Sequence, residues 1–526
     1  MTVITAVIGV DVGGTNTDAV IVDKSGSKAK IISQSKTTTT SDVTSGVCRA
    51  VHLALIDSKR ADRTLAIQQV NIGTTHFINA VIEGKRLAKV AVIRLCGTAS
   101  KQLPPFSDIG ENLAPVVRGS VFLVNGGYQF DGKEITELDE KEITECVKAL
   151  KRNGEKNIVV SGIFSPVCQL QEDTVVEIIK QEYPDASVTA SHTIGKIGIL
   201  ERENAAILNE CIKPLCRETI NGFRIALNDL GLQCPFYLTQ NDGTVLSEER
   251  AMQYPVLSFA SGATNSMRGA AFISGVTEGI VVDIGGTSTD VGVIIKSYPR
   301  EAAAEVKIGG IRTNFSMPDV VSVGLGGGSY VRETNVNGKL QVKVGPLSAG
   351  YRIISEAFIF AETMNIEGRQ VTATDIAVAT DRVSIGCKTN VQHFGEDFVK
   401  QASERIHAIL GDCIDKMRFN DRDLPLVLVG GGSIIIDKHR QFDGVSNVIV
   451  PEGFDVANAV GAALSQISAT TDRIIDLEEI LDKDSLMNET QQEIHQHPSL
   501  SDKEKQTISE KTKARTYRKG KGSSNG

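Results

Sequence analysis

One pattern occurs twice in this 526-residue chain. Residues 8–22 read IGVDVGGTNTDAVIV, and residues 280–294 read IVVDIGGTSTDVGVI. In both, an apolar run of strand length ends in Asp, a Gly-Gly-Thr turn follows, and a second Asp precedes another apolar run. Two unrelated β-turns could resemble each other by chance, but so many turn residues recurring in register argue against it. The repeat predicts two similar halves, each of which opens with a strand–turn–strand hairpin.

The first hairpin continues into further strands and helices. Apolar, β-branched runs at 3–10, 19–23 and 30–35 are separated by short turns, which is typical of an antiparallel meander. Ser41 and Asp42 precede apolar residues at helical spacing and predict a helix start there. Strands and helices then alternate, and we expect them near 90–95, 139–151, 157–161 and 171–182, before a long helix at about 199–230. Such alternation predicts an α/β fold with a largely parallel sheet.

The repeat and the composition together predict three segments. We expect an N-terminal domain at 1–190 with the first hairpin, a second domain at 191–470 with the second hairpin, and a tail at 471–526. The tail has few apolar residues and ends in a basic, Gly/Ser-rich run. It is too polar to pack a core, so we expect it to be disordered and solvated, with an acidic partner as the alternative.

Composition excludes several classes of protein. A formal charge of −8 gives no electrostatic footprint for nucleic acid or an anionic membrane. No apolar run reaches membrane-spanning length. The N-terminal residues have the pattern of a core strand, which argues against a signal peptide. The nine cysteines are scattered and include no CxxC pair, so we expect reduced thiols, no zinc site and a cytoplasmic location.

The hairpin residues have the chemistry of a polyphosphate site. Glycines let the backbone approach an anion closely, and the N–H groups and Thr hydroxyl of each turn supply hydrogen-bond donors. An Asp at the strand end can hold Mg²⁺ directly or through its waters. We therefore predict Asp11 and Asp283 as metal-binding and catalytic residues. The predicted phosphate contacts are Gly13, Gly14, Thr15, Gly285, Gly286 and Thr287.

These motifs resemble those of the superfamily that contains actin, sugar kinases and the heat-shock ATPases. Asp11 to Thr15 match its first phosphate motif, and Asp283 to Thr287 match its second. Its adenosine motif, a strand running into glycines, is matched by Leu426 to Ser433, with Gly430, Gly431 and Gly432 as the contacts. The resemblance implies two actin-like (ribonuclease H-like) lobes, with ATP in the cleft between them and Mg²⁺ as its metal.

Within that superfamily the longer sequence motifs resemble those of the hydantoinase/oxoprolinase family. The form DxGGTxTD is matched at 11–18, and D-x-GGTSTD is matched at 283–290. Further family segments match in order between about residues 5 and 468: the GTT…NA segment at 73–80, an SGP-type loop with its helix at 257–270, a G-x-GGGS loop at 322–329, and a GP-x-SAG segment at 344–350. This resemblance implies a component similar to the N-methylhydantoinase A subunit.

The family resemblance implies ATP-dependent opening of a lactam or cyclic imide, such as 5-oxoproline or a hydantoin. Phosphorylation of the amide oxygen would activate the ring, and a second, hydantoinase B-like subunit would complete the hydrolysis. We also expect an oligomer. Three alternatives remain open: a small-molecule kinase, the ATPase subunit of a carboxylase, and a non-enzymatic nucleotide-dependent switch.

Other residues near the motifs allow two interpretations each. Asp18 and Asp290 could brace the hairpins by accepting hydrogen bonds from turn N–H groups, or could act in catalysis. Gly326, Gly327 and Gly328 could form an anion-binding nest or only a tight turn. Arg268 could contact substrate or form a surface ion pair, and His76 could be a general base or a structural residue.

The chain departs from the family pattern at three places. Ile72 stands where the family usually has His before Gly73, and Ala263 stands where its Pro is expected. The family's PGPACYG stretch is absent after Gly350, where Tyr351 follows. We expect all three changes to lie in segments that face the substrate.

Overall fold

The computed structural model describes residues 3–26, 29–39, 43–59, 64–302, 306–336, 339–362, 367–419 and 421–468. The chain divides into two compact units, 1–465 and 466–526. The elements below belong to the first unit, apart from the short strand β21 (Gln466–Ile467). The predicted tail at 471–526 and the predicted helix start at Ser41 and Asp42 lie outside the described residues, and the predicted boundary at 190/191 stays a prediction.

The first sheet is built around the N-terminal hairpin. Its strands in the first unit run in the order β10-β9-β4-β1-β2-β3. The strands β1 to β3 form the predicted antiparallel meander, while β4 and β9 lie parallel to β1. The bounds are β1 (Val3–Val12), β2 (Asn16–Asp23), β3 (Lys30–Thr38), β4 (Thr64–Thr74), β9 (Phe236–Thr239) and β10 (Thr244–Leu246). The apolar runs predicted as strands at 3–10, 19–23 and 30–35 lie within β1, β2 and β3, so these predicted strands are confirmed.

The second sheet repeats this arrangement around the second hairpin. Its strands run in the order β13-β12-β11-β19-β20, and β16 also pairs with β12. The strands β11 and β12 are antiparallel, while β19 and β20 lie parallel to β11. The bounds are β11 (Glu278–Ile284), β12 (Thr289–Ile295), β13 (Tyr298–Pro299), β16 (Val320–Val323), β19 (Leu424–Val429) and β20 (Val445–Ile449). The duplication read from the sequence therefore extends from the turns to the strand order.

A third, all-parallel sheet lies in the chain between β4 and the long helix α6. Its order is β6-β5-β7-β8. The elements that the sequence predicts here are confirmed to within a few residues. They are β5 (Val90–Leu95), α4 (Glu140–Asn153), β7 (Asn157–Gly162), α5 (Leu170–Glu182) and α6 (Ile199–Asp229). Three further elements were not predicted from the sequence: α3 (Ala114–Val117), β6 (Arg118–Val124) and β8 (Ser187–Ala190). The chain is thus a mixed α/β protein.

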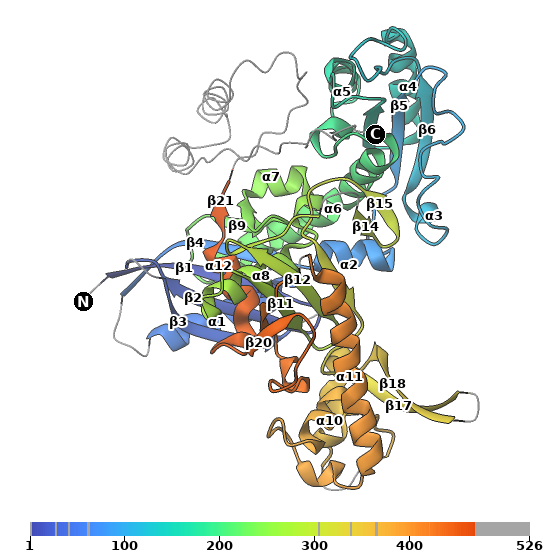
Figure 1. Cartoon of the computed structure of the whole chain (residues 1–526). Coiled ribbons are helices and arrows are strands. Elements are labelled where there is room, and N and C mark those ends of the chain that lie inside the picture. The colour runs from blue at the N-terminus through green and yellow to red at the C-terminus, as the bar shows by residue number, and fades with distance from the viewer. Residues whose placement is uncertain are drawn as a thin grey trace, which may run out of the picture. The chain divides into compact units, whose positions relative to one another are not determined.

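One helix packs closely on both the first hairpin and a second helix, because glycine removes the side chains between them. The helices are α8 (Ser261–Ser274) and α12 (Ala457–Leu464). A Cβ on Gly461 would lie 1.8 Å from the Asn265 carbonyl oxygen, and one on Gly9 would lie 2.1 Å from that of Ala459. Figure 1 shows the result, with α12 from the C-terminal part of the chain beside β1 and β2 from the N-terminal part.

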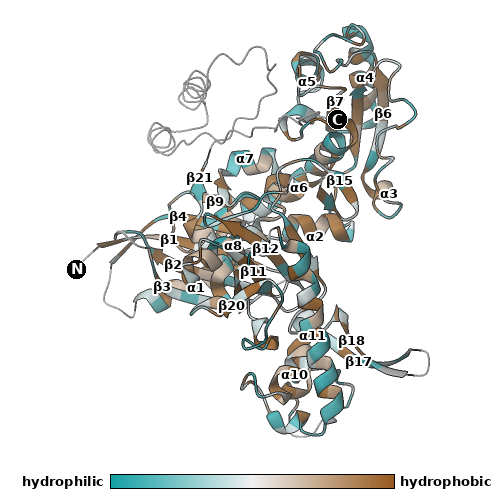
Figure 2. Cartoon of the chain, viewed as in Figure 1, coloured by the Kyte–Doolittle hydropathy of each residue, from teal (hydrophilic) through white to brown (hydrophobic). Residues whose placement is uncertain are grey.

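The remaining elements complete the first unit. Buried Ile406, Leu410 and Ile414 form the inner face of α11, while other residues of that helix are teal, and therefore hydrophilic, in Figure 2. The remaining elements of the first unit are α1 (Val43–Lys59), α2 (His76–Glu83), α7 (Glu248–Gln253), β14 (Val306–Ile308), β15 (Ile311–Thr313), β17 (Ser329–Val336), β18 (Lys339–Ser348), α9 (Ile353–Glu356), α10 (Ala373–Ala379) and α11 (Glu396–Met417), with short 3₁₀ turns between them. Within the described ranges, no helix has both the length and the apolar character needed to cross a bilayer.

Candidate functional site

A row of charged residues crosses the first sheet at the ends of its strands. Asp11 ends the apolar run of β1 and lies opposite Asp18 of β2, which in turn lies opposite Lys36 of β3. Lys36 Nζ donates to Asp18 Oδ2 over 2.7 Å. Both aspartates are buried, at 6% and 8% exposure, and on the other side Asp11 lies opposite Gly73 of β4. The sequence thus places two carboxylates and one ammonium group in a single row.

The second sheet carries the matching row with different neighbours. Asp283 lies opposite Asp290 on β12, and Asp290 lies opposite Ser322 on β16. The Ser322 hydroxyl donates to Asp290 Oδ1. The Ser266 hydroxyl, from the buried face of α8, donates to Asp283 Oδ2 over 2.7 Å. Hydroxyl groups therefore take the place that the lysine has in the first row.

The glycine segments of the three predicted motifs pack against one another. A Cβ on Gly286 would lie 3.6 Å from Thr15 Cγ2, so the two phosphate turns are neighbours. Gly432 N–H donates to the Ile284 carbonyl oxygen over 2.7 Å. Gly430 has φ of +83°, and a Cβ there would lie 2.2 Å from Asp283 Oδ1. Only glycine fits this position, since any side chain would displace the carboxylate or the backbone.

Two of these glycines have open space around them. No atom lies within 4 Å of the position that a Cβ would take at Gly14 or at Gly431, and both residues are exposed. By contrast, the N–H groups of Gly326, Gly327 and Gly328 donate to Ser329 Oγ and to the carbonyl oxygens of Gly285 and Gly286. The 326–328 loop thus supports the second turn, and its N–H groups are not available for an anion-binding nest.

Burial raises the pKa values of these four aspartates above the ordinary value for Asp. Burial is the largest cause that raises the pKa of Asp11 to about 7, and the charges of Asp18 and Asp283 raise it further. Burial likewise raises the pKa of Asp290 to about 6 and raises the pKa of Asp18 and of Asp283. Carboxyl groups perturbed in this way are typical of functional sites, where a cation or substrate supplies the missing partner.

The aspartates fit a hard divalent cation that has further ligands. Asp11 Oδ1 is buried, and no described residue gives it a hydrogen bond. An orphaned carboxylate oxygen suits Mg²⁺, which prefers oxygen ligands and keeps several waters. The part of the chain that the structure describes contains no group of three or more His, Cys, Asp or Glu side chains that could hold a metal. A cation held at Asp11 or Asp283 would therefore need further ligands besides these carboxylates.

Two family models match this chain over the segments that carry these rows. Residues 7–183 match the hydantoinase/oxoprolinase N-terminal region, and residues 202–386 match the hydantoinase/oxoprolinase domain. The chain belongs to the hydantoinase/oxoprolinase family. The resemblance read from the DxGGTxTD and D-x-GGTSTD motifs is confirmed.

Curated relatives within the family have more than one activity. The acetophenone carboxylase gamma subunit of Aromatoleum aromaticum is 27% identical over 380 residues, which cover 65% of this chain and 49% of the relative. The caprolactamase subunit alpha of Pseudomonas jessenii is 25% identical over 231 residues, which cover 43% of this chain and 33% of the relative. This chain spans about half or less of the length of these relatives.

A solved structure shares the fold. The ATP-dependent caprolactamase from Pseudomonas jessenii superimposes with a TM-score of 0.69 and 20% sequence identity, covering 93% of this chain and 75% of that chain. This likeness agrees with the mixed α/β architecture described above. The identity is too low to carry over an activity.

Several expectations about single residues near the motifs need correction. Asp18 accepts from Lys36 and not from a turn N–H group, and Asp290 accepts from Ser322. Among the described residues Arg268 forms no ion pair: its guanidinium lies over the Tyr298 ring, 4.4 Å from the centroid, and donates to the Gly243 carbonyl oxygen. These contacts are structural.

The three departures from the family pattern differ in their surroundings. Ile72 is fully buried in the hydrophobic core, so the expectation that this position faces substrate is wrong. Ala263 is half-buried on α8. Tyr351 is 70% exposed, next to Gly350, whose Cβ position is 3.6 Å from Thr287 Oγ1. Of these positions, only Tyr351 combines a freely accessible side chain with proximity to a phosphate turn.

His76 offers weak support for a role as general base. Its Nε2 lies 3.4 Å from an Arg86 guanidinium nitrogen, and burial together with the Arg86 charge lowers its pKa. The side chain begins α2 and is half-buried. Both interpretations of His76, general base and structural residue, therefore stay open.

Besides Ser322, sequence reasoning missed three residues that contact the aspartates. Lys36 pairs with Asp18, Ser266 donates to Asp283, and Asn458 Nδ2 donates to Asp11 Oδ2 over 3.3 Å. Asn458 lies at the opposite end of the chain from Asp11 and comes close only because α12 packs on β1. The small residues of 457–463 were the available signal, since they predict a helix in tight contact with its neighbours.

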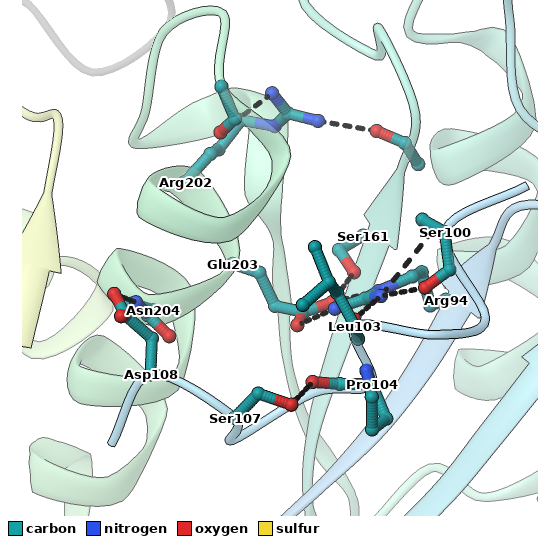
Figure 3. Close-up of polar contacts among 12 residues, drawn as sticks. Arg94, Ser100, Leu103, Pro104, Ser107, Asp108, Ser161, Arg202, Glu203 and Asn204 are labelled. Atoms are coloured by element: carbon teal, nitrogen blue, oxygen red, sulfur yellow. Dashed lines mark hydrogen bonds and ion pairs between the residues drawn. The ribbon is translucent and has the colours of Figure 1, made fainter. Parts of the chain in front are cut away.

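A second cluster of buried charge lies at the start of α6 (Figure 3). Arg94 of β5 and Glu203 of α6 are almost inaccessible and form a two-pronged ion pair, with Nε to Oε2 at 2.8 Å. Arg94 also donates to the Leu103 carbonyl oxygen, and Ser161 donates to Glu203. Because these groups satisfy one another, the cluster joins α6 to the parallel sheet and offers no free group to a ligand.

A cavity of about 530 Å³ lies among α10, α11 and the turn that precedes α11. Its lining includes Thr380, Lys388, Phe394 and Ser403 but no residue of the glycine motifs. The size of this cavity alone therefore does not identify the reaction site.

Proposed function

We propose that this chain binds Mg-ATP between its two Asp-Gly-Gly-Thr hairpins and uses the γ-phosphoryl group to activate the amide of a lactam or cyclic imide. The observation that carries the proposal is the meeting of the two hairpins, with the unpartnered Asp11 Oδ1 beside Asp283 and exposed glycines at Gly14 and Gly431. We further propose that the repeated strand order is that of two actin-like lobes with the nucleotide in the cleft between them.

The chain's own residues would act by positioning. Thr15 and Thr287 can donate hydroxyl groups to phosphate oxygens, and the backbone at Gly14 leaves room for the phosphate chain to approach. Gly431 has similar room for the adenosine. Asp11 and Asp283 would hold Mg²⁺, which when bound neutralises charge on the β- and γ-phosphate oxygens. Asp283 could also orient the attacking group.

The proposed reaction consumes one ATP and two waters for each ring that is opened. The amide oxygen attacks the γ-phosphorus, the bond to the bridging oxygen breaks, and ADP leaves with that electron pair. The product is an imidoyl phosphate, in which the carbon is a better electrophile than the amide. Water then adds to this carbon, and the ring C–N bond breaks as the nitrogen takes up a proton, which leaves an acyl phosphate. A second water adds to the acyl carbon and inorganic phosphate leaves, so that the ring opens to a carboxylate with one ATP and two waters consumed.

A partner subunit is part of this proposal. Relatives of this chain are named as subunits, alpha in a caprolactamase and gamma in a carboxylase. The sequence motifs account for holding ATP and activating an oxygen, but none supplies an evident group for the hydrolytic half. We therefore propose that a hydantoinase B-like subunit completes ring opening. The predicted oligomer and the predicted cytoplasmic location stay predictions.

An ATP-hydrolysis assay with a panel of compounds tests the proposal. Purified chain is incubated with Mg-ATP and with 5-oxoproline, hydantoin, caprolactam or glucose, with and without a hydantoinase B-like subunit. We expect a lactam or imide to stimulate phosphate release, with stoichiometric ring opening only when the partner is present. Unaided ring opening at one turnover per ATP would refute the partner requirement, and a phosphorylated sugar would replace the proposal with a kinase.

The carboxylase alternative has one specific observation in its favour. The relative with 27% identity is a carboxylase subunit. In a carboxylase, bicarbonate and a ketone would stimulate ATP hydrolysis, while lactams would not. Adding bicarbonate with acetophenone to the same panel separates the two activities.

A further inference from the structure

A short segment of the chain contacts all three predicted nucleotide motifs. It consists of residues 454–458, where the turn Phe454–Val456 leads into α12. The Phe454 carbonyl oxygen accepts from Gly430 N–H over 2.8 Å, and the Asp455 carbonyl oxygen accepts from Lys36 Nζ over 3.0 Å. We call residues 454–458 the connector.

The last residue of the connector reaches both aspartates. Asn458 Nδ2 donates to Asp11 Oδ2 over 3.3 Å, and the Asn458 side chain also lies close enough to Asp283 to offset part of the rise that burial causes in the pKa of that carboxyl. A side-chain amide has two N–H donors, so one Asn can serve two carboxylates. The neutral side chain of Asn458 thus lies between the strand-end carboxylates of the two hairpins, hydrogen-bonded to the first and beside the second.

The surroundings of Asn458 fix the direction of its amide. Val456, Ala457, Ala459 and Val460 are all buried, so the backbone on both sides of Asn458 is held by packing. Gly9 allows α12 to lie directly on β1, because a Cβ there would collide with the Ala459 carbonyl oxygen. The amide is therefore presented by a rigid element and not by a loop.

A neutral donor suits a pair of carboxylates that must also bind a cation. Asp11 and Asp283 repel each other in a buried site, and N–H groups offset that repulsion without cancelling the negative charge. A lysine at this position would cancel the charge that attracts Mg²⁺. Asn458 leaves Asp11 Oδ1 without a partner and thus available to the ion.

We propose that Asn458 is a positioning residue, which holds the carboxylates of Asp11 and Asp283 in one geometry so that both act on the same metal–nucleotide complex. The inference rests on the proposed function, since it assumes that this site binds Mg-ATP. Groups that orient metal ligands in this way are typically worth about 10- to 100-fold in metal affinity. The effect should therefore appear in metal-dependent binding above all.

The test compares Asn458→Ala with Asn447→Ala, the same substitution at an exposed residue of β20. The dissociation constant of a fluorescent, non-hydrolysable ATP analogue is measured with saturating Mg²⁺ and again with EDTA, and the melting temperature is measured without ligand. Asn458→Leu is measured in parallel, because it keeps side-chain volume while removing both donors.

We expect Mg²⁺ to lower the dissociation constant of the analogue in the wild type and in Asn447→Ala. In Asn458→Ala and Asn458→Leu the factor by which Mg²⁺ lowers this constant should be about tenfold smaller. Binding in EDTA should change less than about twofold in all variants, because the phosphate turns are untouched. An unchanged Mg²⁺ effect in both Asn458 variants would overturn the inference. An equal loss with and without Mg²⁺, accompanied by a lower melting temperature, would also overturn it, by showing a purely structural role.

Failure of the proposed function gives a different result. If the wild type itself binds the analogue without any effect of Mg²⁺, or does not bind it, the nucleotide site is refuted and the role of Asn458 falls with it. If the wild type responds to Mg²⁺ and the Asn458 variants respond equally, only the positioning role is refuted.

Discussion

The two hairpins carry the same residues in the same register, yet their surroundings differ. In the first, Asp11 and Asp18 are both buried, and Lys36 pairs with Asp18 at 2.7 Å. In the second, Asp283 and Asp290 are less deeply buried and receive hydrogen bonds from Ser266 and Ser322. Each hairpin also has a glycine on the neighbouring parallel strand or just after it, Gly73 in one case and Gly430 in the other.

The difference separates what the repeat must keep from what each half can vary. Both halves keep an Asp at the strand end and a glycine turn, which are the groups that the proposed metal and phosphates need. The charge balance is not kept, because a lysine supports one row and hydroxyl groups support the other. The first row therefore holds three ionisable groups in a drier place, while the second holds two.

The largest expected effect comes from removing either strand-end carboxylate. We expect Asp11→Asn and Asp283→Asn to lower Mg²⁺-dependent ATP turnover at least about 100-fold, since each removes charge from the transition-state environment. Exposed Asp185→Asn is the control and should match the wild type. Phosphate release under saturating Mg-ATP measures the effect. Full activity in both site variants would remove the basis for pairing the hairpins.

Glycine substitutions should distinguish the two halves in stability. Gly430→Ala forces a side chain into a backbone with φ of +83° and within 2.4 Å of the Ile284 carbonyl oxygen, so we expect a loss of about 2–5 kcal/mol in the free energy of unfolding. Gly73→Ala should cost less, because its nearest obstacle is the Asn265 side-chain amide. Gly431→Ala, with no atom within 4 Å, is the control. Urea denaturation ranks the three, and equal losses would contradict the packing described.

Stability should depend on pH through the raised carboxyl pKa values. Folded Asp11 holds its proton up to about pH 7, whereas an ordinary Asp loses it near 3.8, so the unfolded chain binds fewer protons between these values. The contribution of Asp11 is therefore fully present below pH 3.8 and is lost as the pH rises through about 7, by at most about 4 kcal/mol at 1.36 kcal/mol per pKa unit.

Variants divide this pH dependence between the hairpins. Without metal, Asp11→Asn should gain stability relative to the wild type as the pH rises from about 4 to about 7, and Asp290→Asn should do so only up to about pH 6. Denaturation midpoints at several pH values in EDTA measure both. Parallel curves for the wild type and Asp11→Asn would show that the Asp11 carboxyl titrates normally.

The smallest effects concern the groups that distinguish the two rows. Lys36→Met leaves the Asp18 carboxylate without its cation, and we expect a loss of about 1–2 kcal/mol, reduced because the Lys36 side chain is 35% exposed. Ser322→Ala removes one exposed hydrogen bond and should cost less than about 1 kcal/mol. Chemical denaturation at pH 7 compares them, and a larger loss in Ser322→Ala would reverse the contrast between the hairpins.

Local sequence patterns predicted the hairpins, the meander and the parallel elements because these depend on residues close together in the chain. The repeat also predicted which aspartates and glycines would meet. Asn458 and Ser266 escaped prediction because their positions depend on how α8 and α12 pack over the sheets, which no local spacing records. Ile72 was misjudged for a related reason: a departure from a family pattern does not say whether the side chain points into the core or into a site.

A structure determined with Mg²⁺ and a non-hydrolysable ATP analogue tests the central claim most directly. The account predicts the triphosphate between the turns at 13–15 and 285–287, the metal beside Asp11 Oδ1 and Asp283, and the adenosine at 430–432. Nucleotide bound elsewhere, for example in the cavity lined by Phe394, with both aspartates left without metal, would contradict it.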